Sequence, residues 1–400
     1  MNFRRSQRPS HSNKFSKKSL QLETVTLRME RMAQGGDAIS HLEDGRICFV
    51  AGALTGEFAE VVLTQNKKDY AKGFAKKILE KSEFRTEPAC PFYGKCGGCS
   101  LEHATLEFQL EMYRASVEDL FRRFAKTELP RGWKIHSGKP YGYRNRARLV
   151  RTENGWGFRE TQSHRVIPVS KCMVLTSGLN QALAENAFPP VPELSVFDNG
   201  NGKISYYYKG MNPADFKKFA MNSVQIGEDS ISMDSACFFQ SNLEVLPELV
   251  ETVKKAAGKG NYLIDLFSGV GFFAKVLQKN FKKIVTVERE PKALYHANQN
   301  VPEAHNVSSP AEDWLPQNDA SGADVLIVDP PRTGLPPSSI EAIAKANPKK
   351  WIYVSCDPAT LARDFKVLSE NFGYKILNAE GFAFYPQTPH FEMFLELTRV

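Results

Sequence analysis

Several features that would place this chain in a special class of protein are missing from its sequence. No stretch approaches the ~18–20 consecutive apolar residues that a membrane-spanning helix needs. The first residues lack the hydrophobic core and small-residue cleavage site of a secretory signal peptide. The cysteines number seven, and an odd count argues against a framework of disulfide bonds. We therefore expect a cytoplasmic protein without a membrane segment.

Acidic residues are missing from the first 20 positions, which carry six arginines and lysines. The whole chain has a net charge of +7, so this arm holds nearly all of the excess positive charge. Such an arm can lie on the phosphates of a nucleic acid or can simply be a solvated segment. Residues 1–20 are therefore predicted to be a basic flexible arm.

The remaining composition is that of a globular protein, with 42% hydrophobic and 24% charged residues in 400. This length predicts two or three domains. In residues 21–82, short alternating runs are separated by glycine-containing turns, a pattern that favours a five-stranded β-barrel of OB type. Residues 83–230 read as a mixed α+β central domain, which opens with clustered cysteines and a helix over 106–124.

Residues 231–400 alternate between strand and helix patterns. Strands are predicted over 262–267, 283–287, 325–329 and 351–355, with a helical pattern after each. Two further strand-like runs close the chain. This order predicts a Rossmann-like, doubly wound parallel sheet with an antiparallel end.

A candidate cofactor site follows the first of these strands. Leu263–Gly271 is a hydrophobic strand that runs into a Gly-X-Gly turn before a helix. The third glycine of the dinucleotide motif is missing, so the turn fits an adenosyl group better than a pyrophosphate. Glu288 ends the next strand, where a carboxylate can accept both ribose hydroxyls. The sequence therefore predicts that S-adenosylmethionine (SAM) binds here.

The segment Asp329-Pro330-Pro331-Arg332 follows the third strand of this region. Enzymes that methylate amino groups of bases carry a similar motif with an aromatic fourth residue, which stacks on the base. Arg332 is not aromatic, so methylation of adenine is disfavoured. The alternative is a proline-rich turn without a function.

Cys356 lies where a hydrophobic strand ends and the next helix begins, a place that favours the thiolate form. A thiolate can add to carbon 6 of uracil and so make carbon 5 nucleophilic enough to accept a methyl group. A base must then remove the proton from carbon 5, and Glu392 is the best candidate. The alternatives are a buried structural cysteine and an exposed carboxylate at a strand edge.

Taken together, these motifs resemble the bacterial RNA uracil-C5 methyltransferases that act on large-subunit ribosomal RNA. The Ser-Cys-Asp-Pro and Asp-Pro-Pro-Arg segments are the most specific part of the resemblance. The matching segments span nearly the whole chain: Cys90-x5-Cys96-Gly-Gly-Cys99, Tyr143–Arg146, Cys172, Phe238–Asn242, Asp265–Gly271, Asp329–Gly334, Ser355–Pro358 and His390–Glu392.

The resemblance implies that residues 21–82 form a TRAM domain, an OB-like RNA-binding barrel, and that residues 231–400 form the catalytic domain. It implies Cys356 as the nucleophile and Glu392 as the base. It also implies that 23S ribosomal RNA is bound before or during ribosome assembly, by a monomer. The SAM pocket it implies is lined by Gln240, Phe267, Glu288 and Asp329.

The resemblance further implies a [4Fe–4S] cluster held by Cys90, Cys96, Cys99 and Cys172. Four thiolates suit four irons, and glycines let the loop fold around a cluster. Zinc would also accept four thiolates and stays open as an alternative. Cys48 and Cys237 have no partner motif and are predicted to be small core residues.

Three other functions remain open from the sequence. The substrate can be a uridine in the T loop of transfer RNA, although that bacterial branch generally lacks the barrel and the cysteines. It can also be a cytosine in RNA, although those enzymes usually carry a second cysteine near Asp329. The chain can finally be an RNA-binding iron–sulfur protein without activity, which an intact Cys356 argues against.

Overall fold

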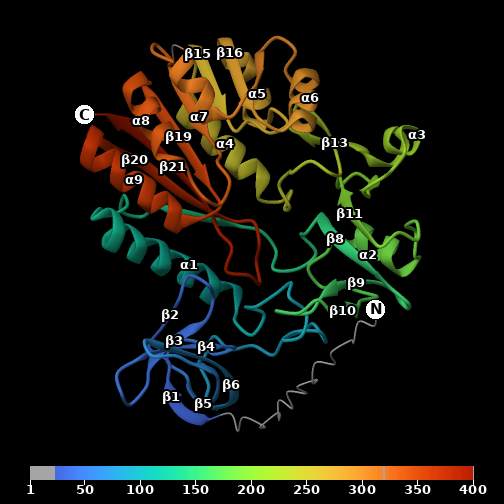
Figure 1. Ribbon diagram of the computed structural model, residues 1–400, viewed down its shortest axis with the longest axis vertical. Helices are drawn as coiled ribbons and strands as arrows, with labels where there is room; N and C mark the ends of the chain where they lie inside the picture. Colours follow the sequence, from blue (N-terminus) through green and yellow to red (C-terminus); the bar gives the residue numbers. More distant parts are fainter. Residues whose placement is uncertain (1–22, 319, 400) are drawn as a thin grey trace, which may run out of the picture.

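The computed structural model describes residues 23–318 and 320–399, so the predicted basic arm lies outside the described residues. This part of the chain contains three larger β-sheets and a two-stranded hairpin. Helices cover the central and the C-terminal sheets. The N-terminal sheet lies at one end of the long axis and the largest sheet at the other, with helix α1 between them (Figure 1). The third sheet lies to one side of this axis.

The N-terminal sheet curls around a hydrophobic core of its own, which includes Val50, Val61 and Leu63. Its strand order is β1-β5-β6-β4-β3-β2, which is six strands where five were expected. The additional strand, β2, spans only two residues and is too short to leave a pattern in the sequence. Residues alternate between this core and solvent along β4 and the first half of β6. The bounds are β1 Thr24–Arg28, β2 Arg31–Met32, β3 Ala38–His41, β4 Ile47–Ala51, β5 Phe58–Asn66 and β6 Tyr70–Glu80.

The central region forms an antiparallel sheet of order β10-β9-β8-β11-β12, covered by helix α2. A short helix, α3, leads through a π-helical turn (Phe216–Ala220) into the hairpin β13–β14. The bounds are β8 Arg146–Thr152, β9 Gly155–Arg159, β10 Val166–Pro168, α2 Ser177–Ala184, β11 Glu193–Asp198, β12 Ile204–Tyr207, α3 Pro213–Asp215, β13 Met221–Ile226 and β14 Asp229–Asp234.

The C-terminal region builds a sheet of order β17-β16-β15-β18-β19-β21-β20-β7. Strands β15 to β19 run parallel, and β21 is antiparallel to both of its neighbours, so the predicted parallel sheet with an antiparallel end is confirmed. The strands are β15 Gly260–Leu266, β16 Phe281–Glu288, β17 His305–Ser308, β18 Val325–Val328, β19 Lys350–Ser355, β20 Tyr374–Ala383 and β21 Glu392–Arg399.

Helices cover both faces of this sheet, so its central strands are buried along almost their whole length. The sequence reading contained neither α4 nor the short β17 and α7. The helices are α4 Leu246–Ala257, α5 Phe272–Leu277, α6 Pro291–Asn300, α7 Ala311–Trp314, α8 Pro337–Ala346 and α9 Pro358–Phe372.

Two elements from residues 83–230 belong to this C-terminal layer. Helix α1 (Leu106–Leu120) buries Phe108 and Met112 in the same core as Trp351, and a π-helical turn over Phe121–Ala125 extends it. Strand β7 (Lys134–Ser137) pairs in parallel with β20 and forms the edge of the sheet. The central region therefore leaves this layer after β7 and returns to it before α4.

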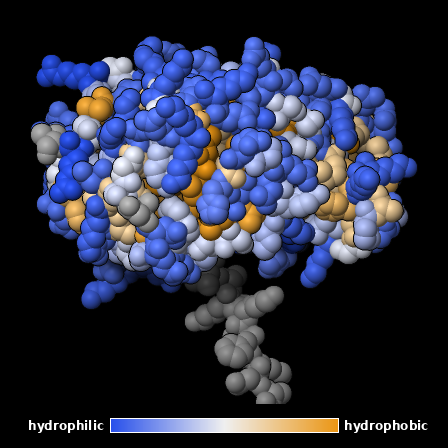
Figure 2. Space-filling model, turned by 90° about the horizontal axis from the view of Figure 1, so that it is seen from above, coloured by the Kyte–Doolittle hydropathy of each residue, from blue (hydrophilic) through white to orange (hydrophobic). Residues whose placement is uncertain are grey.

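Polar and charged residues dominate the end of the molecule at the top of Figure 1. Figure 2 shows that hydrophobic residues form only narrow strips on this face. Among the described residues, no helix has the length and apolar character to cross a bilayer.

Candidate functional site

A cavity of about 730 Å³ opens where the parallel strands of the large sheet end. The carboxyl ends of parallel strands are the usual ligand side of such sheets. Residues predicted separately from the sequence meet in the lining of this cavity. They are Gln240, Phe267, Glu288, Asp329, Cys356 and Glu392.

The turn after β15 brings backbone close to this cavity. Gly269 has a φ of 55°, and the position where its Cβ would lie is open. Gly271 has a φ of 79°, and a Cβ there would be 3.3 Å from the Cα of Ala297 on α6. The first glycine thus leaves room for a ligand, and the second lets two helices pack closely.

Glu288 lies beside this turn at the end of β16. Its Oε2 accepts a hydrogen bond from the Gly269 N–H at 2.9 Å, and its Oε1 accepts one from the Glu290 N–H at 2.7 Å. The carboxylate is thereby held at the cavity wall, where it can accept hydrogen bonds from ribose hydroxyls as predicted.

Two buried polar atoms in the cavity lining have no hydrogen-bond partner: Oε1 of Gln240 and Oγ of Ser268. Buried polar groups are normally paired, so an unpaired set in a cavity points to a polar ligand. The volume, the open glycine turn and the Glu288 carboxylate fit an adenosyl cofactor.

Cys356 and Glu392 come together because β19 and β21 run antiparallel. Ser355, the last residue of β19, is opposite Met393 in the register, so Cys356, which follows it, faces Glu392, the first residue of β21. Both side chains line the cavity. Burial, followed by the charges of Glu392 and Asp329, raises the pKa of the Cys356 thiol to about 12.

The thiol form of Cys356 differs from the expectation that the adjacent helix would favour a thiolate. The side chain of Asp357 caps that helix and accepts the N–H groups of Ala359 and Thr360, both at 3.0 Å. The carboxylate thus satisfies the helix terminus and adds another negative charge near the sulfur. A thiolate must therefore be formed during the reaction.

Three buried acids share this end of the sheet. Burial raises the pKa of Asp329 to about 7. Burial, and after it the charge of Asp329, raises the pKa of Glu392 well above its usual value, while Arg332 acts in the opposite direction. Burial likewise raises the pKa of Asp265 to about 8, although its Oδ2 accepts the Ala274 N–H at 3.0 Å. Charge is therefore costly here unless a cation is close.

Several residues around this cavity have positions that sequence reasoning did not predict, and Arg146 lies in the stretch Tyr143–Arg148, which was expected to contact RNA. Arg146 donates hydrogen bonds to the carbonyls of Cys237 and Phe239, at 2.8 and 2.9 Å, and so fixes the turn that carries Gln240. Tyr385 and His390 line the cavity beside Glu392. Arg146 belongs to a motif noted in the sequence, whereas Tyr385 lies in an irregular loop and has no local signal.

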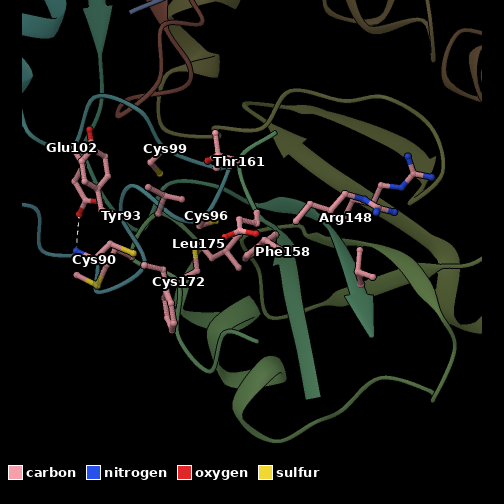
Figure 3. A pocket seen from close by; sticks show the side chains of 18 of the residues that line it. Cys90, Tyr93, Cys96, Cys99, Glu102, Arg148, Phe158, Thr161, Cys172 and Leu175 are labelled. Carbon is pink, nitrogen blue, oxygen red and sulfur yellow. Dashed lines mark hydrogen bonds between the residues drawn. The ribbon is translucent and has the colours of Figure 1, made fainter. Parts of the chain in front are cut away.

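The four predicted cluster ligands line a second cavity, of about 770 Å³, in the central region. Cys90, Cys96 and Cys99 come from the loop before α1, and Cys172 from the loop before α2 (Figure 3). None of them forms a disulfide bond. Four free thiols from two distant loops are a donor set that fits a metal centre.

Buried side chains fix the backbone of these two loops. Oε1 of Glu102, which is buried, accepts hydrogen bonds from the Cys90 N–H at 2.9 Å and the Tyr141 hydroxyl at 3.1 Å. The side chain of Asn180 bonds both the N–H and the carbonyl of Cys172, at 2.8 and 2.9 Å. The loops are thus positioned by protein groups alone.

The spacing of the sulfurs bears on the kind of metal centre. Within residues 23–318 and 320–399, Asp234, Cys237 and His296 form a group whose three ligand atoms all lie within 4.8 Å of one another. No three of the four clustered cysteines in these described ranges do so. Their sulfurs are therefore spread more widely than a single ion requires.

Comparison with known proteins identifies RNA methyltransferases as relatives. The family model described as tRNA (Uracil-5-)-methyltransferase matches residues 319–400. The 23S rRNA (uracil(1939)-C(5))-methyltransferase RlmD of Shewanella amazonensis is 29% identical, over 96% of this chain and 96% of that protein. An uncharacterized RNA methyltransferase of Gloeobacter violaceus is 28% identical, over 95% and 97% of the two chains.

A solved structure has the same fold. The tRNA (uracil-54, C5)-methyltransferase of Pyrococcus abyssi, in complex with S-adenosyl-L-homocysteine, superposes with a TM-score of 0.73. The match covers 93% of this chain and 99% of that chain at 22% identity. The two chains therefore share one overall fold.

Proposed function

Because the chain belongs to the SAM-dependent RNA uracil-C5 methyltransferases, we propose that it methylates carbon 5 of a specific uridine in 23S ribosomal RNA. The observation that carries this proposal is the meeting of Cys356 and Glu392 in one cavity with Asp329 and Gln240. A nucleophile and a base at the mouth of an adenosyl site are what carbon-5 methylation requires.

The residues proposed to bind the cofactor line this cavity. SAM, when bound, would supply the methyl group as an electrophile and would leave as S-adenosylhomocysteine. Glu288 would accept hydrogen bonds from the ribose hydroxyls, and the turn at Phe267 to Gly271 would hold the adenosyl group. Oε1 of Gln240, which lacks a partner, accepts a hydrogen bond from the ligand.

Cys356 acts first on the uracil. Its thiol gives up its proton to solvent water, and the sulfur adds to carbon 6, so that the electron pair of the 5,6 double bond moves toward carbon 5 and the carbonyl oxygen at carbon 4. Carbon 5 then attacks the methyl group. Because burial and the neighbouring carboxylates disfavour the thiolate, its energy is high, which favours its addition to carbon 6.

Glu392 completes the reaction. Its carboxylate takes the proton from carbon 5, the double bond re-forms, and the bond between carbon 6 and sulfur breaks to release the Cys356 thiolate. A buried carboxyl with a raised pKa is a stronger base than an exposed one, which suits this step. The target uridine must leave its stack to reach this cavity.

We also propose that Cys90, Cys96, Cys99 and Cys172 hold a [4Fe–4S] cluster rather than zinc. Zinc–thiolate bonds of ~2.3 Å place the sulfurs of one site ~3.8 Å apart, whereas, among the described residues, no three of these four sulfurs all lie within 4.8 Å of one another. A cluster spreads its thiolates over four irons. Methyl transfer needs no electron donor or acceptor, so the cluster would have a structural role. It would hold the two cysteine-bearing loops together near the RNA.

The N-terminal sheet is proposed to be a TRAM domain that binds RNA around the target. Its strand β6 exposes Lys72, Phe74 and Lys76 on one face, away from the core. Exposed aromatic and basic side chains in alternation suit single-stranded RNA, because rings stack on bases and lysines pair with phosphates. Deleting residues 1–82 should weaken RNA binding much more than SAM binding.

The test is the amount of 5-methyluridine in ribosomal and transfer RNA from cells with and without the gene, measured by mass spectrometry. Loss from large-subunit RNA alone is the expected result. Loss from transfer RNA alone would agree with the proposed chemistry but would show that ribosomal RNA is not the substrate. The matching family model and the similar Pyrococcus abyssi structure are both named for tRNA methyltransferases. No loss from either RNA would overturn the proposal.

Substrate RNA carrying 5-fluorouridine tests the nucleophile separately. Fluorine cannot leave as a proton, so the enzyme should stay attached to this RNA through Cys356. The adduct should disappear in Cys356→Ala and persist in Cys48→Ala, since Cys48 is buried in the N-terminal core. An adduct in Cys356→Ala would assign the chemistry to another residue.

A further inference from the structure

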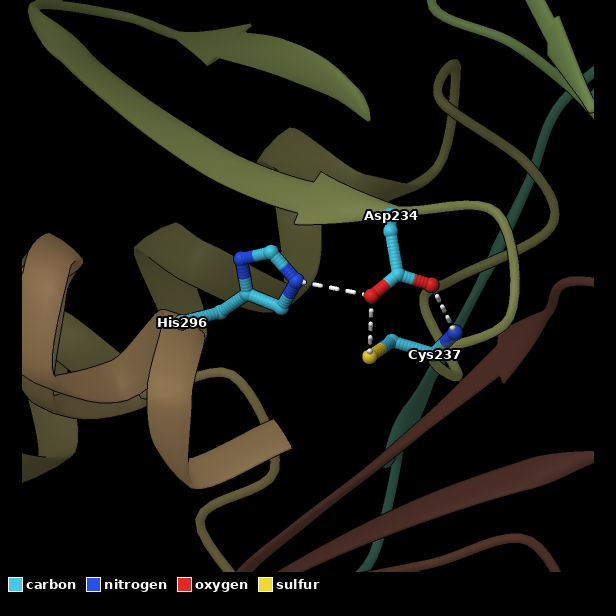
Figure 4. A group of neighbouring side chains, drawn as sticks. All are labelled: Asp234, Cys237 and His296. Carbon is cyan, nitrogen blue, oxygen red and sulfur yellow. Dashed lines mark hydrogen bonds and ion pairs between the residues drawn. The ribbon is translucent and has the colours of Figure 1, made fainter. Parts of the chain in front are cut away.

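Asp234, Cys237 and His296 form a buried group beside the SAM cavity, away from the four clustered cysteines. Asp234 ends β14, Cys237 follows in the next turn, and His296 projects from the middle of α6 (Figure 4). All three side chains are at most 7% exposed. Cys237 was expected to be an ordinary core residue, but the fold surrounds it with two further metal-ligand types.

The ligand atoms of the group converge on one point. Oδ2 of Asp234 is 2.8 Å from Nε2 of His296 and 3.4 Å from Sγ of Cys237. All three ligand atoms lie within 4.8 Å of one another. Tetrahedral zinc, with bonds of ~2.0–2.3 Å, separates its ligand atoms by ~3.3–3.8 Å, so only small movements would admit the ion.

We propose that Asp234, Cys237 and His296 bind a single divalent metal ion of the zinc class. The ligand set of one carboxylate, one thiolate and one imidazole suits zinc or cobalt and does not suit magnesium or calcium. Binding releases the Cys237 thiol proton to solvent and leaves the imidazole neutral. Cys237 lines the SAM cavity, so a water molecule from that side can fill the fourth position.

Charge balance supports a cation at this place. The Asp234 side chain is only 2% exposed, and its Oδ1 accepts hydrogen bonds from the Ala236 N–H at 2.7 Å and the Cys237 N–H at 3.2 Å, which stabilise the charged form of a carboxylate. The carboxylate is therefore negative in a buried environment. A divalent ion with one carboxylate and one thiolate forms a neutral unit, whose burial costs less than that of an isolated charge.

The fold already aligns the elements that carry the three ligands. Asn300, one turn after His296 on the same face of α6, bonds both the N–H and the carbonyl of Ser232 on β14, at 2.8 and 2.9 Å. Arg146 fixes the turn after β14 from its other side. A metal ion here would join α6 to the turn that carries Gln240.

The experiment measures bound zinc in the full-length protein with its cysteine centre reconstituted. We expect one zinc equivalent that is absent from Cys237→Ser and from His296→Asn and is retained in Cys48→Ser. Cobalt in place of zinc should give a thiolate charge-transfer band in the wild type and Cys48→Ser, and none in Cys237→Ser. Cys48 is the matched control, because it is an equally buried cysteine outside any such group.

Either of two results would overturn the proposal: a wild-type protein that binds no zinc beyond the four clustered cysteines, or a Cys237→Ser protein that binds as much as the wild type. The readout does not depend on activity, so it stands apart from the proposed function. If the wild-type protein binds no zinc at this site, the result does not depend on whether any variant folds. The three residues would then be only a hydrogen-bonded network.

Discussion

Glu392 faces Cys356 across the antiparallel pair of β21 and β19, because Ser355 and Met393 are partners in its register. Burial, together with the charge of Glu392, raises the pKa of the Cys356 thiol to about 12. The proposed nucleophile and the proposed base are thus neighbours at one edge of the sheet, although α9 and β20 separate them in the chain.

Replacing Glu392 with glutamine should trap the enzyme on its RNA. Glutamine occupies nearly the same volume but cannot accept the carbon-5 proton, so the sulfur has no route to leave after methyl transfer. We expect a covalent complex with unmodified RNA, stable to denaturation and visible by gel electrophoresis, and turnover reduced ~100-fold or more.

The control for this experiment is Glu396→Gln, which lies on the same strand four residues later, away from the cavity. It should turn over normally without a trapped complex. Normal turnover by Glu392→Gln would remove Glu392 from the mechanism.

Asp265→Asn should change how stability depends on pH. Burial raises the pKa of Asp265 from 3.8 to about 8, so the unfolded chain loses this proton at much lower pH than the folded protein does. Folding stability from this group is full below pH ~4 and falls as the pH rises toward 8, by at most ~1.4 kcal/mol per pH unit.

Asparagine has no such proton and can still accept the Ala274 N–H. In cofactor-free protein, thermal unfolding measured from pH 5 to pH 8 should therefore show a smaller decline for Asp265→Asn than for the wild type. The exposed Asp313→Asn is the control and should follow the wild type. Parallel pH profiles for all three proteins would contradict the raised pKa of Asp265.

Arg85→Ala should destabilise the junction that follows the N-terminal sheet. Glu57 is fully buried and accepts two hydrogen bonds from Arg85, at 2.5 and 2.7 Å, as well as the Leu54 and Ser82 N–H groups. Removing the arginine leaves a buried carboxylate without its cation, which costs about 3–5 kcal/mol.

Hydrogen exchange of β5 and β6 measures this loss locally. The matched control is the exposed ion pair of Arg28 and Glu80, at 2.6 Å, for which Arg28→Ala should cost at most about 1 kcal/mol. Equal effects of the two arginine substitutions would show that burial does not strengthen the Arg85 contact.

Cys172→Ser should abolish the iron content of the protein, because Cys172 is the one ligand that the second loop supplies. We expect four irons and four sulfides per wild-type chain by chemical analysis, and a loss of most of both in the variant. Cys48→Ser should retain them. Zinc without iron in the wild type, lost in Cys172→Ser, would replace the cluster with a zinc site.

The local sequence was sufficient to place a candidate residue when its position depends on a single strand or a single turn. Cys356 and Asp329 each end a hydrophobic strand, and the parallel order of those strands brings their ends together. The Gly-X-Gly turn at Gly269 and Gly271 follows the same logic, because its chemistry depends on backbone angles.

Features that depend on contacts between distant parts of the chain could not be predicted from the sequence. Strand β7 is only four residues long and pairs with β20. His136 of β7 and Glu380 of β20 form a hydrogen bond but lie 244 residues apart in the chain, so no local pattern could assign β7 to this sheet. The raised pKa of Cys356 depends on burial and on charges from two other strands, which outweigh the helix beside it. Arg146 gains its role only from the carbonyls that the fold brings to it.

The place of β7 at the sheet edge has a consequence for synthesis on the ribosome. At ~5–20 residues per second, β7 leaves the ribosome on the order of tens of seconds before its partner β20 is made. During this interval α1 and β7 have no large sheet to pack against, and the apolar face of α1 is uncovered. The first and last thirds of the chain therefore complete one layer together, and the nascent protein depends on its final strands to bury its earliest helix.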